Sequence, residues 1–191
     1  MLSIIIPTLN SERLLVPTLA ALVSGATEGL IREVLLADGG SQDDTAVVAD
    51  VAGCKFLKLD PPLGERLRVA AAAARGPWLL FLRPGIILDA AWIGETRRFI
   101  ELTRDSERAA AFRRGAAASS PLREALAQAM AAFGAKPRPE QGLLISRRFY
   151  DGVGGHRVEA ADPEAGLIRH IGRKRIVRLA TSALMATTPD T

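Results

Sequence analysis

The fold is indicated by Leu35-Leu36-Ala37-Asp38-Gly39-Gly40-Ser41-Gln42-Asp43-Asp44-Thr45, an apolar strand that ends in an acid, two glycines and a helix start. The two glycines can adopt backbone angles that other residues avoid, and Ser41 with Asp44 reads as a capping pair that opens a helix. Asp38 is therefore expected at the carboxyl end of a strand, where open α/β sheets bind their ligands. We interpret this corner as a ligand-binding site.

The composition predicts one globular domain. The chain has 191 residues, of which 48% are hydrophobic and 24% charged, enough to bury one good core. Its net charge of +4 is mild and carried mainly by Arg, which suits a phosphate-bearing ligand or an anionic membrane surface. With one Tyr and two Trp to stack on bases, nucleic acid is not expected as a partner. The one cysteine, Cys54, excludes an intramolecular disulfide and gives no zinc cluster.

The N-terminus and the apolar runs indicate the cellular location to expect. The N-terminus runs straight into a strand with no basic leader, so we expect no signal peptide. No apolar run reaches the ~20 residues that span a bilayer. We therefore expect a cytoplasmic protein.

Strands and helices alternate along the chain, which predicts an α/β fold with a mostly parallel sheet flanked by helices. Strands are expected at residues 3–7, 33–37, 54–59, 78–82 and 109–112. Helices are expected at residues 14–24, 45–52, 65–75, 90–102 and 121–133. The first helix would hold Pro17 in its first turn and stop at Gly25. The helix at 65–75 is rich in alanine, and its short side chains would let it pack close to the sheet.

Three segments occur in the order found in a known family. They are Ser3-Ile4-Ile5-Ile6-Pro7-Thr8-Leu9-Asn10, the stretch at 35–45, and the small residues followed by an apolar strand at 70–82. Together they resemble the nucleotide-sugar half of family 2 glycosyltransferases of the GT-A fold. The resemblance implies one GT-A-like, Rossmann-like domain, with a nucleotide-binding half at 1–85 and an acceptor-side half at 86–191. It implies that the donor is held by Pro7, Thr8, Asn10, Asp38 and Gly39, with Asp38 at the base.

A later segment resembles the acceptor side of the same family. It combines a strand and an Arg pair at 140–149 with a Gly-Gly turn. The resemblance implies that the acceptor pocket is shaped by Gln141, Arg147, Arg148, Gly154, Gly155 and His156. His156 stands where relatives carry an aromatic, so its ring would stack on an acceptor. The alternative is that this lone histidine at a turn is simply exposed.

One departure from the family pattern affects the metal. Relatives follow the apolar strand with an acid that holds a divalent cation, Mg²⁺ or Mn²⁺, on the donor diphosphate. Here Arg83-Pro84-Gly85 follows Leu82, and Gly85 stands at the position of that acid, so we assign no metal ligand. Arg83 would replace the cation as a fixed positive charge, or else catalysis has been lost.

The resemblance implies inverting glycosyl transfer with a carboxylate as general base. Asp162-Pro163-Glu164 stands where relatives carry a Glu-Asp pair that opens a helix. Asp162 is the first candidate for the base, Glu164 the second and Glu159 the third. Ala161, where relatives have Glu, departs from the pattern. The alternative is that Asp162 only caps a helix whose first residue is Pro163.

Several polar residues have a structural alternative. Asp38 could satisfy the Gly39-Gly40 turn, and Thr8 and Asn10 could be turn formers. Acidic side chains at 43 and 44 are expected as helix-terminus charges. Arg66 and Arg68 could reach a phosphate, although solvated helix charges are commoner. The basic run at 173–175 is expected to face solvent, with a weak tendency to meet anionic lipid.

The sequence thus predicts transfer of a sugar from a nucleotide-sugar donor, of UDP or GDP type, to an acceptor hydroxyl. The alternative is a catalytically degenerate relative that binds a nucleotide or a protein partner. A nucleotidyltransferase is a weaker interpretation, because no basic glycine-rich phosphate loop follows the first strand. The acceptor is not specified by the sequence, and peripheral membrane association and a homodimer both stay open.

Overall fold

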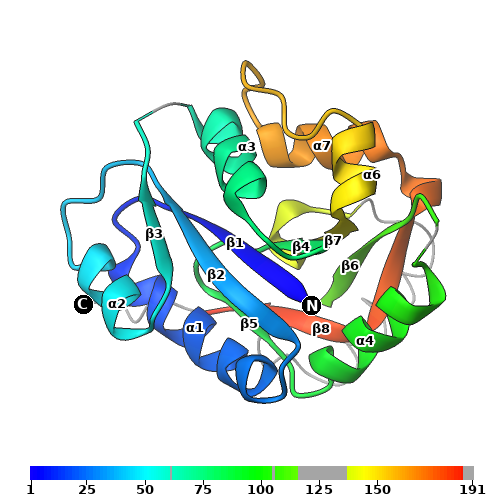
Figure 1. Cartoon of the computed structure of the whole chain (residues 1–191), viewed down its shortest axis with the longest axis horizontal. Coiled ribbons are helices and arrows are strands. Elements are labelled where there is room, and N and C mark those ends of the chain that lie inside the picture. Colours follow the sequence, from blue (N-terminus) through cyan, green and yellow to red (C-terminus); the bar gives the residue numbers. More distant parts are fainter. Residues whose placement is uncertain (61, 105, 116–136, 187–191) are drawn as a thin grey trace, which may run out of the picture.

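A computed structural model describes residues 1–60, 62–104, 106–115 and 137–186 (Figure 1). Its eight-stranded sheet has the order β3-β2-β1-β4-β7-β6-β8-β5. The strands are β1 (Leu2–Thr8), β2 (Ile31–Asp38), β3 (Lys55–Lys58), β4 (Trp78–Phe81), β5 (Ile86–Leu88), β6 (Ala109–Arg114), β7 (Leu143–Ser146) and β8 (Ile176–Met185). The first four run parallel, β7 is antiparallel to β4 and β6, β8 is parallel to β6, and β5 is antiparallel to β8. The predicted α/β class with a mostly parallel sheet is confirmed.

Helices cover both faces of the sheet. One layer holds α1 (Glu12–Thr27), α2 (Thr45–Val51) and α4 (Trp92–Leu102), and the other holds α3 (Leu63–Ala73), α6 (Arg147–Gly152) and α7 (Pro163–Ile171) (Figure 1). Short 3₁₀ turns form η1 (Pro139–Gln141) and η2 (Arg173–Arg175). None of the helices in the described ranges is long and apolar enough to cross a membrane.

Hydrophobic cores lie on both faces of the sheet, because successive side chains of a buried strand point to opposite faces. Ile4 and Ile6 pack with the α1, α2 and α4 layer, whereas Ile5 packs with the α3, α6 and α7 layer. Strands covered on both faces read as continuous apolar runs, as residues 4–6 do. Ala70 and Ala71 of α3 are buried against the sheet, as expected for short side chains on a close-packed helix, whereas Ala72 is exposed.

Helix α1 corrects two predictions. It begins at Glu12, so Pro17 lies in its second turn and not in its first. Gly25 does not end the helix, which continues to Thr27, with Gly29 at φ +70° just beyond it. Gly25 is instead a packing position, because a Cβ there would lie 2.4 Å from Cζ2 of Trp92.

The remaining elements agree with the expected ranges or lie outside them. Strand β5 has three residues and follows the Pro84-Gly85 turn, and no strand is expected there from the sequence. It exists because it pairs with β8, with Ile86 opposite Met185. The helix expected at 121–133 lies outside the described residues.

Candidate functional site

The carboxyl ends of β1 and β2 form the first part of the site. Thr8 and Asp38 are partners in the parallel register, so their side chains meet at the end of the sheet. The Asp38 carboxylate accepts hydrogen bonds from Thr8 Oγ1 at 2.9 Å, from the backbone N–H groups of Gly40 and Ser41 at 2.8 Å each, and from Ser41 Oγ at 2.5 Å. The side chain is buried, with the residue 1% exposed.

These contacts define the protonation state and the role of Asp38. Burial acts to raise its pKa, but the hydrogen bonds from Ser41, Thr8 and Gly40 outweigh it, and the pKa lies below its ordinary value of 3.8. Asp38 is therefore a carboxylate whose two oxygens each already accept two hydrogen bonds. The geometry supports the turn-forming alternative, in which Asp38 shapes the loop that follows it.

The loops after β1 and β2 are tied to each other by side chains. Asn10, at φ +49°, donates its backbone N–H to Ser41 Oγ at 2.9 Å and accepts from the backbone N–H of Gln42 at 2.8 Å. Asp43 accepts from the backbone N–H of Glu12 at 3.0 Å and from Thr45. The predicted Ser41 cap is wrong, because Ser41 Oγ is bonded to the Asp38 carboxylate and to the backbone N–H of Asn10. Asp43 lies just before α2, as expected, but it also links the two loops.

Arg66 braces the same corner from α3. Its Nη1 donates to the carbonyl oxygens of Thr8 and Ala37, both at 3.0 Å. The guanidinium lies against Gly39, where a Cβ would come within 2.4 Å of Nη1, so a larger residue there would displace Arg66 from its two carbonyl partners. The expectation of a solvated Arg66 is wrong, whereas its neighbour Arg68 is exposed as expected.

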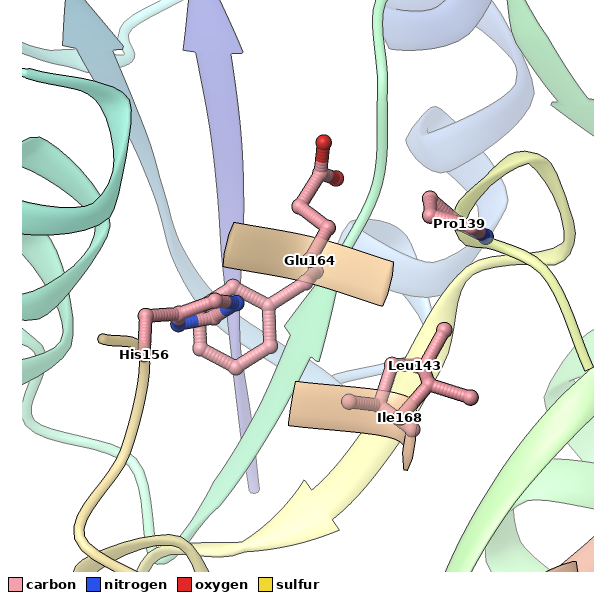
Figure 2. Close-up of a pocket in the computed structure, with 6 residues that line it drawn as sticks. Pro139, Leu143, His156, Glu164 and Ile168 are labelled. Carbon is pink, nitrogen blue, oxygen red and sulfur yellow. The ribbon is translucent and has the colours of Figure 1, made fainter. Parts of the chain in front are cut away.

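The second part of the site is a small pocket, lined by Phe81, Pro139, Leu143, His156, Glu164 and Ile168. Figure 2 shows His156 on one side, Pro139, Leu143 and Ile168 on the other, and Glu164 projecting between them. Glu164 belongs to the first turn of α7, and Phe81 and Leu143 come from the paired strands β4 and β7. The pocket thus sits where the parallel part of the sheet meets its antiparallel part.

An ion cluster borders the pocket. Arg83 contacts Oε2 of Glu164 through Nη2 at 2.7 Å and Nε at 2.8 Å, and Oε1 of Glu140 through Nη1 at 3.0 Å. The Glu164 side chain is 8% exposed and that of Glu140 is 39% exposed. Burial raises the pKa of Glu164, and Arg83 opposes the rise without cancelling it. Nothing in the sequence signals Glu140, because its partner lies 57 positions away.

The residues after β4 do not fit a divalent cation. Gly85 has φ +88°, and its N–H donates to Thr18 Oγ1 at 2.8 Å. A Cβ at Gly85 would lie 3.2 Å from the Met185 sulfur, so an acidic side chain there would require Met185 to shift. Asp89 is already bonded to Thr181, Ser182 and Ala91. Within the described ranges, no group of three or more His, Cys, Asp or Glu could hold a metal ion.

The three candidate bases differ in position. Asp162 is exposed and is the N-cap of α7, where its Oδ1 accepts from the backbone N–H of Ala165 at 2.9 Å. Glu159 is also exposed. Glu164, the second candidate from the sequence, is the one that lines the pocket. Asp162 thus has the capping role, and Glu164 is the candidate that the structure places at the pocket.

Most of the residues expected around the acceptor have structural roles. Arg147 donates to the carbonyl oxygens of Ala71 at 2.7 Å and Ala74 at 2.5 Å, and so caps the end of α3. Gln141 is buried and donates to the Phe112 carbonyl at 2.6 Å. Arg148 is exposed, and the glycines at 154 and 155 form a turn with positive φ.

His156 is the one residue of that expected acceptor set that lines the pocket. It is 1% exposed, its Nδ1 lies 2.9 Å from Tyr150 Oη, and its ring meets Phe81 edge-on with centroids 4.7 Å apart. Burial lowers its pKa to about 3, so the ring is neutral near pH 7. The alternative of an exposed histidine is wrong.

Comparisons with known proteins agree on the fold. Staphylococcus aureus TarS 1–349 matches with a TM-score of 0.71 at 17% identity, over 97% of this chain and 60% of that one. TarS 1–349 in complex with UDP-GlcNAc gives a TM-score of 0.72 at 17% identity, over 100% and 59%. Glucosyl-3-phosphoglycerate synthase from Mycobacterium tuberculosis, in complex with Mn²⁺, UDP and glucosyl-3-phosphoglycerate, gives 0.68 at 19% identity, over 99% and 73%. None of the curated proteins compared with the chain matches it in sequence.

The sheet and its helices have the GT-A glycosyltransferase fold, and the chain spans about three fifths of the length of TarS 1–349. Residues 3–84 match glycosyl transferase family 2. The matched segment contains the Asp38 corner and ends at Pro84, one residue beyond Arg83.

Proposed function

We propose that the chain transfers a sugar from a nucleotide-sugar donor, of UDP type, to an acceptor hydroxyl. The observation that carries the proposal is a buried Glu164 in a pocket, in contact with Arg83, at the end of the sheet where the Asp38 corner also lies. Support for the donor class comes from TarS and glucosyl-3-phosphoglycerate synthase, whose structures hold UDP-GlcNAc and UDP.

In the proposed reaction, Glu164 is the general base. Its carboxylate takes the proton of the acceptor hydroxyl as that oxygen bonds to the anomeric carbon. The bond from this carbon to the diphosphate oxygen breaks on the opposite face, so the configuration inverts. A carboxylate with a raised pKa suits this role, because a base works best when its pKa approaches the working pH.

The other groups bind and orient. The braced loops after β1 and β2 offer backbone and side-chain groups to the nucleoside, with Asp38 and Arg66 holding their shape. Arg83 supplies the positive charge for the diphosphate, because its guanidinium lies beside the pocket in contact with Glu164. His156, neutral and fixed by Tyr150, forms a wall of the pocket.

Glu164→Gln tests the proposal by sugar-transfer assay with a panel of UDP- and GDP-sugars. Turnover should fall ~10²-fold or more, while UDP binding measured by calorimetry is retained. Asp162→Asn is the matched control, because Asn caps a helix about as well as Asp, and it should keep its activity. Loss of turnover in Asp162→Asn, with Glu164→Gln active, would return the role of base to Asp162.

A noncatalytic nucleotide-binding protein is the second candidate function. It is favoured by the ion pair that already occupies Glu164 and by the glycine at position 85. Nucleotide binding without turnover of any donor in the unmutated chain would establish this alternative.

A further inference from the structure

The charges around Arg83 pose a problem for a diphosphate. One guanidinium is shared by two carboxylates, so the cluster of Arg83, Glu140 and Glu164 is net negative when all three are ionised. Asp162 adds a further negative charge nearby. A donor diphosphate would meet repulsion here unless one carboxylate leaves the guanidinium.

The two carboxylates differ in how readily they can leave. Glu164 is buried and contacts Arg83 through two nitrogen atoms, and moving it would break a buried ion pair. Glu140 makes one contact and has a side chain that is 39% exposed, so it can rotate into water. Exposed pairs of this kind contribute little to stability, so their exchange costs little.

The backbone at Glu140 is held in place, whereas its side chain is 39% exposed. Its neighbour Gln141 is held by a 2.6 Å bond to Phe112, and Pro139 lines the pocket. Only a side-chain rotation is therefore needed to uncover Nη1 of Arg83 beside the pocket.

We propose that Glu140 is an internal competitor for the diphosphate: it covers Arg83 in the free protein, and the diphosphate of the donor displaces it. Arg83 then joins the leaving group to Glu164, which it continues to hold. The inference rests on the proposed function, because it takes a nucleoside diphosphate as the ligand. It makes Glu140 a residue that sets affinity for the diphosphate without touching the reacting atoms.

Calorimetry with UDP and with uridine tests this proposal in Glu140→Gln. The amide keeps the shape and removes the charge, so UDP should bind ~2- to 5-fold more tightly, the scale of one exposed ion pair, while uridine affinity is unchanged. Glu140→Ala should behave alike. Glu28→Gln is the control, because Glu28 forms a similar half-exposed pair with Arg97 elsewhere and changes the net charge equally.

The effect should also depend on Arg83. In an Arg83→Gln background, Glu140→Gln should change UDP affinity no more than Glu28→Gln does, since the competition has been removed. Suppose that Glu140→Gln binds both uridine and UDP, but binds UDP no more tightly than the unmutated protein does. That result would overturn the competitor role and leave the proposed function standing. If UDP binds to none of the variants, both the competitor role and the proposed function are overturned.

Discussion

Asp38→Ala tests whether one carboxylate holds the nucleotide corner together. Truncation leaves two backbone N–H groups and the hydroxyls of Thr8 and Ser41 without their acceptor. A hydrogen bond to a charged group contributes ~1.5–3 kcal/mol, but the four share one acceptor and the hydroxyls can rotate, so their contributions do not add. We expect Asp38→Ala to lower the free energy of unfolding by about 3–5 kcal/mol.

Asp38→Asn is the matched variant. Its amide oxygen can accept from the backbone N–H groups of Gly40 and Ser41, and its NH₂ can donate to the two hydroxyls. Neutral hydrogen bonds are roughly half as strong as those to a charged group, so the loss should be about 1–2 kcal/mol. Urea unfolding, followed by the fluorescence of buried Trp78 and Trp92, measures both.

The same carboxylate gives a pH signature. Because its pKa is lowered in the folded state, its stabilisation is present above the ordinary value of 3.8 and is lost as the pH falls through the lower folded value. Asp38→Asn should lack this acid loss. A wild-type urea midpoint for Asp38→Ala, together with weakened nucleotide binding, would refute the bracing role and support direct contact of Asp38 with the base.

Three further changes test packing, the metal position and the buried histidine. Gly25→Ala should cost ~1–3 kcal/mol in urea unfolding, because its Cβ would meet the ring of Trp92, and a gain would contradict this packing. Gly85→Asp should cost ~1–2 kcal/mol at φ +88° and create no Mn²⁺ dependence of UDP binding; a new Mn²⁺ requirement would show that an acid fits there. Between pH 7 and pH 5 the free energy of unfolding should fall by ~2 kcal/mol. The reason is that His156 in the unfolded chain binds a proton, whereas the folded ring, with a pKa of about 3, does not. His156→Gln should flatten that profile.

The sequence predicts the elements better than the contacts between side chains. Alternating apolar runs and glycine turns place β1, β2 and the Asp38 corner, because those signals are local. The partners of Asp38 lie partly within the same stretch, which is why its turn-forming role could be weighed in advance. The contacts of Arg66 with Thr8 and of Arg83 with Glu140 join residues 57 or 58 positions apart, and nothing local specifies them.

The assignment of the base shows the same limit. Asp162 and Glu164 lie two positions apart at the start of one helix, so spacing alone cannot tell which faces the pocket. The angle between successive residues on a helix turns the exposed cap outward and Glu164 inward. Strand β5 could not be predicted either, since three residues carry no periodicity and depend on β8 for pairing.

The pairing of β5 with β8 also has a consequence for the order of folding. Ile86 follows the Arg83 turn directly, yet its strand partner is Met185, so this contact closes a loop of about 100 residues. Gly85 is held in the same way, its carbonyl accepting from Ala186 at 2.7 Å. Contacts so distant along the chain form slowly, because the entropy of loop closure is lost before they can stabilise the fold. The parallel strands β1 to β4 can therefore assemble early, while the turn that carries Arg83, already bonded to Thr18 of α1, gains its contacts with Met185 and Ala186 only when the last strand docks.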